Sequence, residues 1–179
     1  MRHHTIEVSP FFYFLFNDKK ISWFWIIIRL YVGYEWLIAG WSKVTSDAWV
    51  GSGAGSALLG FLNGALAKTV GAHPDVQGWY AYFLQSAVVT HPAFWSNLVA
   101  WGELAVGIGL IIGAFTGIAA FFGLFMNLNY LLAGTVSSNP VLFTLSIGLV
   151  LAWKVAGYIG ADKYLLPRLG VRPDNVVGG

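Results

Sequence analysis

Six polar or ionisable residues interrupt otherwise apolar stretches of the sequence, and they are the first candidates for chemistry. These residues are Arg29, Glu35, Glu103, Asn127, Asn129 and Lys154. A charged side chain within a membrane is costly, so it normally faces the interior of a helix bundle and marks a functional site. Two carboxylates close together at low dielectric favour protonation of one of them. Glu35 and Glu103 therefore predict a catalytic site that takes up or releases protons.

The residues that accompany the two acids suggest a ligand for such a site. Amide and hydroxyl groups can hold a carbonyl oxygen by hydrogen bonds, and aromatic rings can flank a flat head group. A quinone that enters from the membrane has both features. We therefore predict quinone binding by Tyr34, Trp101, Asn127 and Asn129.

Other roles remain open for the same polar residues. Glu35 and Glu103 could simply hold helices together, or Glu35 could pair with Arg29 or Lys43. Arg29 and Lys154 are interpreted as anchors whose long side chains reach outward to lipid phosphates.

The composition places the chain in a lipid bilayer. Hydrophobic residues make up 57% of the 179 residues and charged residues 10%, with a mean hydropathy of +0.67. Soluble domains carry about 25% charged residues. The net charge of +2 is too small to indicate nucleic-acid binding. We expect an all-α integral membrane protein.

Redox cofactors bound by the chain itself are not expected. The sequence has no cysteine, so it offers no thiolate for an iron-sulfur cluster or a disulfide. No histidine lies within an apolar span, which leaves haem and copper without their usual ligands. His73 and His91 each precede a proline and are interpreted as turn residues, so no metal site is predicted.

Four segments are long and apolar enough to cross a bilayer, which takes roughly 20 residues. They cover residues 23–41, 97–115, 116–134 and 141–160. In antiparallel neighbouring spans, Glu35 and Glu103 would lie at one level, each about 4.5 Å from the midplane. Small residues at spacing four predict close packing of these helices. They are Ala105, Gly109, Gly113 and Gly117.

The first two spans are separated by residues 42–96, a segment too apolar for a solvated loop. Two short helices, over 54–68 and 76–90, are expected there as interfacial or re-entrant helices that form an outer cap. The predicted organisation is an N-terminal cytoplasmic or interfacial segment 1–22 without a removable signal peptide, a four-transmembrane-helix bundle 23–167, and a poorly ordered tail 168–179. The distribution of Lys and Arg outside the spans predicts cytoplasmic termini.

Several separated motifs resemble the DoxX/DoxD family of small membrane proteins over residues 22–168. They are RLYVGYEWLIAGWSK (29–43), HPDVQGWYAYFL (73–84), WGELAVGIGLIIGAFTGIAA (101–120), FGLFMNLNYLLAG (122–134) and AGYIGADKYLLP (156–167). The polar residues within these motifs are Arg29, Glu35, Lys43, His73, Gln77, Glu103, Asn127 and Asn129. The resemblance implies a four-helix fold and a link to respiratory chemistry, because described relatives are subunits of thiosulfate:quinone oxidoreductase.

The leading hypothesis is thus a membrane subunit of a quinone-linked respiratory oxidoreductase that binds quinone or relays protons. It would receive electrons from a partner subunit, because the chain has no redox group of its own. The alternative is a non-catalytic accessory or assembly subunit that anchors a larger complex. A small transporter is less favoured, since the sequence has no internal repeat.

Overall fold

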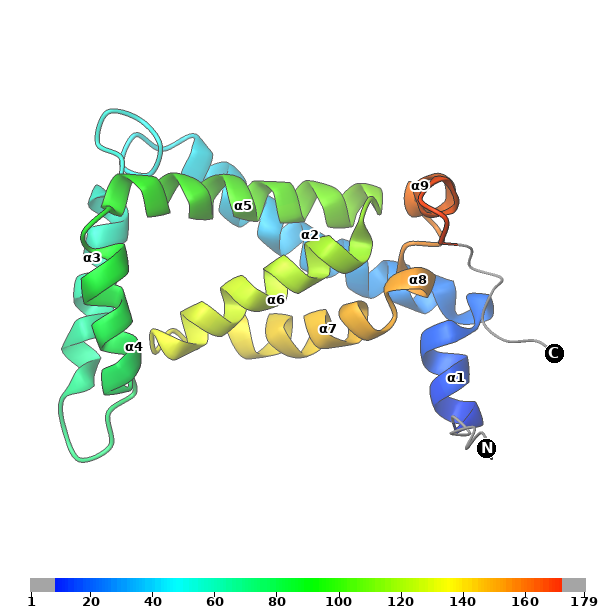
Figure 1. Cartoon of the computed structure of the whole chain (residues 1–179), viewed down its shortest axis with the longest axis horizontal. Coiled ribbons are helices and arrows are strands. Elements are labelled where there is room, and N and C mark those ends of the chain that lie inside the picture. Colours follow the sequence, from blue (N-terminus) through cyan, green and yellow to red (C-terminus); the bar gives the residue numbers. More distant parts are fainter. Residues whose placement is uncertain (1–8, 172–179) are drawn as a thin grey trace, which may run out of the picture.

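The computed structural model describes residues 9–171, which form helices and no strands. The N-terminal segment 1–22 and the tail 168–179 lie partly outside these residues, as do parts of the predictions about a signal peptide and about order in the tail. Within the described range the predicted all-α fold is confirmed. The bundle and a group of short helices across one of its ends account for most of the chain (Figure 1).

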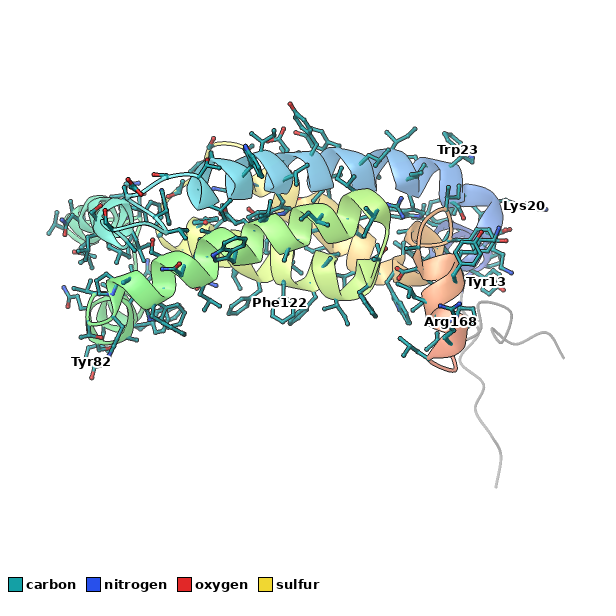
Figure 2. All side chains as sticks on the ribbon, turned by 90° about the horizontal axis from the view of Figure 1, so that it is seen from above. Tyr13, Lys20, Trp23, Tyr82, Phe122 and Arg168 are labelled. Carbon is teal, nitrogen blue, oxygen red and sulfur yellow. The ribbon has the colours of Figure 1, made fainter. Side chains whose placement is uncertain are left out.

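Four apolar helices lie side by side in the bundle (Figure 1). Two of them, α2 (Ser22–Val44) and α5 (Pro92–Ile112), are long and apolar enough to cross a membrane. The other two, α6 (Thr116–Leu132) and α7 (Asn139–Leu151), are shorter. Large apolar side chains such as Trp23 and Phe122 project from the outer faces (Figure 2). The bundle therefore presents an apolar surface as well as an apolar core.

Two predicted span boundaries differ from the structure. α5 ends at Ile112 because Gly113 takes a φ of +66°, a left-handed conformation that ends helices. The segment 141–160 is not one helix: α7 ends at Leu151, and the short helix α8 (Trp153–Ala156) follows after Ala152. The expectation of a continuous fourth span is therefore wrong at this point.

Glycines set the distance between α2 and α5. A Cβ atom at Gly40 would lie 2.3 Å from the backbone nitrogen of Leu104, and one at Gly107 would lie 2.4 Å from that of Leu37. A real Cβ atom does not come this close to another backbone, so only glycine fits at these two positions. The two helices therefore approach more closely here than side chains would allow. Gly40 meets Leu104 and Leu37 meets Gly107, so residue numbers increase in opposite directions along the two helices. α2 and α5 are therefore antiparallel.

The predicted series of small residues does not form one contact face. Ala105 is exposed, Gly109 faces Ala119 of α6, and Gly113 ends the helix. The predicted close packing is present, but its closest contacts use Gly40 and Gly107 instead.

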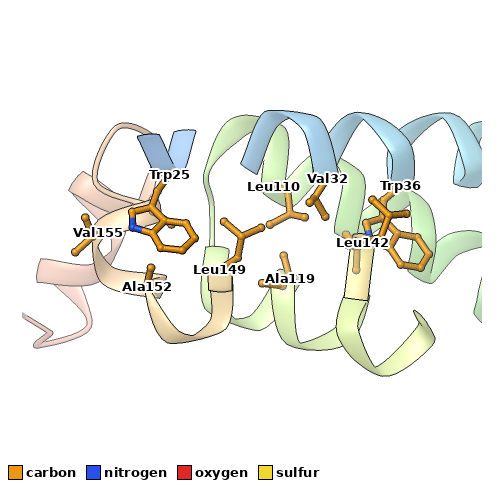
Figure 3. Packing of buried hydrophobic residues seen from close by; sticks show 12 residues of the cluster. Trp25, Val32, Trp36, Leu110, Ala119, Leu142, Leu149, Ala152 and Val155 are labelled. Carbon is orange, nitrogen blue, oxygen red and sulfur yellow. The ribbon is translucent and has the colours of Figure 1, made fainter. Parts of the chain in front are cut away.

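Two hydrophobic cores stabilise the molecule. The first fills the bundle and includes Val32, Leu110 and Leu149 between two buried tryptophans, Trp25 and Trp36 (Figure 3). The second joins α3 (Ser56–Leu66), α4 (Gly78–Phe83) and a π-helical turn over Leu84–Val88. These helices lie across the end of the bundle, as Figure 1 shows. We call residues 42–96 the cap.

The opposite end of the bundle holds α1 (Pro10–Asn17), α8 and α9 (Asp162–Arg168) (Figure 1). Asp162 is buried there and accepts hydrogen bonds from the backbone N–H groups of Phe115 and Thr116, at 2.6 and 2.8 Å. These groups begin α6, so the carboxylate stabilises the turn between α5 and α6. Both ends of the described chain therefore lie opposite the cap.

Candidate functional site

Glu103 is a buried carboxylate in the half of the bundle next to the cap, with 1% of its surface exposed. It lies on α5, on the face that meets α2. Its Oε2 atom accepts a hydrogen bond from Lys43 Nζ at 2.6 Å, which is also an ion pair. Its Oε1 atom accepts a short hydrogen bond from the Tyr130 hydroxyl. A buried charge needs such compensation, and here both carboxylate oxygens have it.

Lys43 comes from the last turn of α2, next to the cap. Its side chain is 18% exposed, so it connects the buried carboxylate with the surface. The ammonium group also lies 5.1 Å from the centre of the Trp49 ring, a cation–π distance. The sequence indicated Lys43 only as a possible partner of Glu35.

Tyr130 lies near the end of α6 and is held from two sides. Its ring stacks on Trp36 with centroids 6.4 Å apart, and Phe61 of the cap meets it edge-on at 5.9 Å. These contacts direct the hydroxyl toward Glu103. Tyr130 was not among the predicted site residues, although it directly follows Asn129, and spacing along the chain does not predict its pairing with Glu103.

An apolar cavity of about 810 Å³ adjoins this site and runs between α3, α4, α5 and α6. Its walls are aliphatic and aromatic, including Phe83, Ile118 and Met126. Polar atoms enter the walls chiefly at one end, where Tyr80, Asn129 and Tyr130 lie. A cavity of this volume is in the usual range for a small organic ligand. We refer to it as the groove.

Asn129 and Tyr80 form a second polar contact in the groove wall. The Tyr80 hydroxyl donates to the Asn129 side-chain oxygen at 3.1 Å and lies 3.0 Å from its backbone oxygen. The Asn129 amide nitrogen donates to the carbonyl of Phe125 at 2.8 Å. Burial raises the pKa of Tyr80 to about 12, so this hydroxyl keeps its proton at neutral pH.

The other predicted site residues lie elsewhere. Glu35 is half-buried and has no hydrogen bond or ion pair within the described part of the chain, so the two carboxylates do not share partners. Tyr34 and Trp101 are more than half exposed and do not line the groove. Asn127 is completely buried between helices, and neither atom of its amide has a partner. Of the six predicted residues, the structure joins Glu103 and Asn129 to the groove region.

Arg29 was expected to reach outward to lipid, and this expectation is wrong. Only 2% of the residue is exposed, and its guanidinium donates to the carbonyls of Ala156 and Ile159 at 2.9 and 2.8 Å. Side chains at Gly113 or Gly160 would collide with it. Arg29 therefore joins α2 to the end of α8 and to the residues that follow it, at the end of the bundle opposite the cap.

Among residues 9–171, no group of three or more His, Cys, Asp or Glu residues is arranged to hold a metal ion. The polar atoms that face the groove are hydroxyl and amide groups, which suit a carbonyl ligand better than a cation.

Apolar helices with exposed aromatic surfaces, enclosing a compensated buried charge, define the chain as a helical membrane protein. The family model for DoxX matches residues 24–135, and the chain belongs to the DoxX family. The match contains Lys43, Glu103 and Tyr130, together with all of the cap. No curated protein and no solved structure matches the chain.

Proposed function

We propose that this chain is the membrane subunit of a quinone-linked oxidoreductase, similar in reaction type to thiosulfate:quinone oxidoreductase. The observation that supports this most directly is the environment of Glu103. One oxygen of its carboxylate is bonded to a cation beside the cap, and the other to a hydroxyl at the groove wall. A titratable group in this position can pass protons between water and a membrane-soluble ligand.

The groove fits a quinone by its shape and by its few polar atoms. An apolar cavity of about 810 Å³ can hold an aromatic head group with part of an isoprenoid tail. Tyr80, Asn129 and Tyr130 would hold the head group, because their polar atoms gather at one end of the lining. The bound quinone would supply a two-electron acceptor whose reduction also requires two protons.

We call Lys43, Glu103 and Tyr130 the relay, and each of them has a defined part in moving a proton. In the structure the Tyr130 hydroxyl donates to Glu103; once Glu103 has been protonated, the hydroxyl would turn, give its proton to the ligand in the groove and regain one from Glu103. Glu103 takes its proton from Lys43, and Lys43 regains one from water at the cap. The Lys43 ammonium also stabilises the Glu103 carboxylate between transfers, at a separation of 2.6 Å. The relay supplies the protons one at a time.

The electrons come from a partner protein in this proposal. The sequence contains no cysteine, so a thiol, disulfide or iron-sulfur group that delivers electrons must belong to another chain.

We further propose that four segments cross the cytoplasmic membrane of a prokaryote. They are α2, α5, α6, and α7 together with α8. Lys20, Lys163 and Arg168 lie at the end opposite the cap, which favours a cytoplasmic position for both termini. The cap would then face outward.

Quinone binding by the purified protein tests the proposal without the partner. A soluble quinone analogue that enters the groove should quench tryptophan fluorescence, since Trp95 lines it. Tyr130→Phe should weaken binding by about tenfold, the value of one hydrogen bond of roughly 1.4 kcal/mol. Glu35→Gln is the matched control and should bind normally. Equal binding by wild type and Tyr130→Phe would contradict the assignment of Tyr130.

Membranes that contain the whole complex provide the second test. Glu103→Gln keeps the size and one acceptor of the side chain but cannot carry a proton in the same way. Quinone reduction should fall by roughly 10² or more, the usual contribution of a proton-transfer group. Unchanged reduction with a stably folded Glu103→Gln variant would refute the relay. Loss of activity in Glu35→Gln instead would restore the paired-carboxylate hypothesis.

A non-catalytic accessory role is the second candidate, because the Lys43–Glu103 ion pair also joins α2 to α5. In that case Glu103→Gln would reduce the amount of assembled complex, while the activity of each remaining complex would stay normal.

A further inference from the structure

An apolar layer crosses the middle of the bundle on the side of Glu103 away from the cap. It consists of one residue from each of the four helices, Val32, Leu110, Ala120 and Leu149, all with 0% of their surface exposed. Figure 3 shows three of them, Val32, Leu110 and Leu149, gathered between Trp36 and Trp25. Interiors packed in this way exclude water.

The layer lies between two sets of buried polar groups. Leu110 follows Glu103 by seven residues on α5, which corresponds to about 10 Å along the helix. Beyond it lie Arg29 and Asp162, whose side chains form hydrogen bonds with backbone groups at that end of the bundle, and Thr116, whose buried hydroxyl has no partner. Within the described residues no hydrogen bond joins this set to Glu103 or Tyr130.

The cap side offers a route from Glu103 to the surface. Lys43 contacts Glu103 directly and reaches the surface, where Ser42, Thr45 and Asp47 are exposed around the end of α2. The groups that face Glu103 are Lys43 from α2 and Tyr130 from α6. Among the residues that the structure describes, Lys43 therefore connects Glu103 with water at the surface.

Three further residues with buried, unpartnered polar atoms, Trp36, Asn127 and Ser146, lie between the layer and the cap; Ser146 is one turn from Leu149 on α7. The Trp36 Nε1 atom has no partner and would lie 2.9 Å from a Cβ atom at Gly123, one turn before Asn127. Because the Trp36 ring also stacks on Tyr130, the indole spans the level of Asn127. These groups widen the polar region near Glu103 without crossing the layer.

We infer that Glu103 exchanges protons with water on the cap side only, through Lys43, and that the layer of Val32, Leu110, Ala120 and Leu149 blocks exchange with the opposite side. The redox meaning of this inference rests on the proposed function: protons used or released at the groove would appear on one membrane face. The water access itself does not depend on any quinone.

The absence of cysteine makes the inference directly testable in the full chain. Single cysteines would be introduced by Lys43→Cys, Glu103→Cys and Leu110→Cys, and the protein would be reconstituted in liposomes. A charged, membrane-impermeant methanethiosulfonate reagent would be applied to either face separately. His73→Cys in the cap and Lys163→Cys beyond α8 mark the two faces, since both residues are exposed.

The inference predicts a one-sided pattern of modification. The Lys43→Cys variant should react from the face that labels His73→Cys, and the Glu103→Cys variant should react from that face at least tenfold more slowly. The Leu110→Cys variant should react from neither face. Reaction at position 103 or 110 from the Lys163 face, or failure of Lys43→Cys to react from the cap face, would overturn the inference.

Asn127→Cys provides a second reporter if Glu103→Cys does not fold, because the Asn127 side chain has no partner to lose. Its reaction from the cap face would support the inference, and protection from the cap face or reaction from the Lys163 face would contradict it. Since labelling needs no quinone, a one-sided pattern without quinone binding would refute the proposed function alone. Quinone binding with two-sided labelling would refute the inference alone.

Discussion

Replacing Lys43 with methionine would leave the Glu103 carboxylate buried beside Tyr130 alone. Loss of one partner of a buried ion pair costs about 3–5 kcal/mol, because the other charge remains uncompensated. Glu103 is 1% exposed, but Lys43 is 18% exposed and the Tyr130 hydrogen bond remains. We therefore expect Lys43→Met to lower the free energy of unfolding by about 2–3 kcal/mol, below the full range.

The charge itself is isolated by a second substitution. Glu103→Gln removes the charge but keeps an acceptor for Tyr130, so it should cost about 1 kcal/mol. The double variant should lose only about 1–1.5 kcal/mol, because neither member of the pair is then left charged. The resulting coupling of roughly 2 kcal/mol is the measured quantity.

Reversible unfolding in mixed micelles, followed by circular dichroism, would provide these free energies. Single-variant losses that add to within about 0.5 kcal/mol would refute the argument, since independent sites behave in that way.

Three further predictions concern packing and the groove wall. Gly40→Ala should cost about 1–3 kcal/mol, because its Cβ atom would lie 2.3 Å from a backbone nitrogen of α5, whereas Gly60→Ala, with open space around it, should be neutral or slightly stabilising in the same unfolding assay. Asp162→Ala removes both hydrogen bonds to the start of α6 and should cost about 2–3 kcal/mol, while Asp162→Asn should cost less; thermal unfolding measures both. Tyr80→Phe should cost about 1 kcal/mol at neutral pH. Because the pKa of Tyr80 rises from 10.0 to about 12 on folding, its contribution should be complete below pH 10 and decline as the pH rises toward 12, a decline that Tyr80→Phe should lack.

The sequence was sufficient to predict that the chain is a membrane protein and that it is helical. A chain with 57% hydrophobic and 10% charged residues is suited to lipid rather than to water. Helices are favoured in lipid because they satisfy their own backbone hydrogen bonds. The DoxX resemblance is confirmed over residues 24–135. The first span and the start of the third were predicted to within a few residues, because turn residues and aromatic anchors mark them.

The breaks that depend on tertiary contacts were not predicted. α7 ends at Leu151 although the following residues remain apolar, and Arg29, in a separate helix, bonds to the carbonyl of Ala156 just beyond. A periodic pattern records which residues avoid water, but it does not record a hydrogen bond between residues 127 positions apart.

The same division applies to the candidate site. Counting residues from the ends of a span predicts the depth of a side chain, and it indicated Glu103, which the structure places in the interior of the bundle. It does not predict the rotation of a helix about its axis. That rotation is decided where Gly40 of α2 meets the backbone of α5. The contact turns Gly40 and Lys43, which are three residues apart, toward α5 and leaves Glu35 to one side, so Lys43 pairs with Glu103.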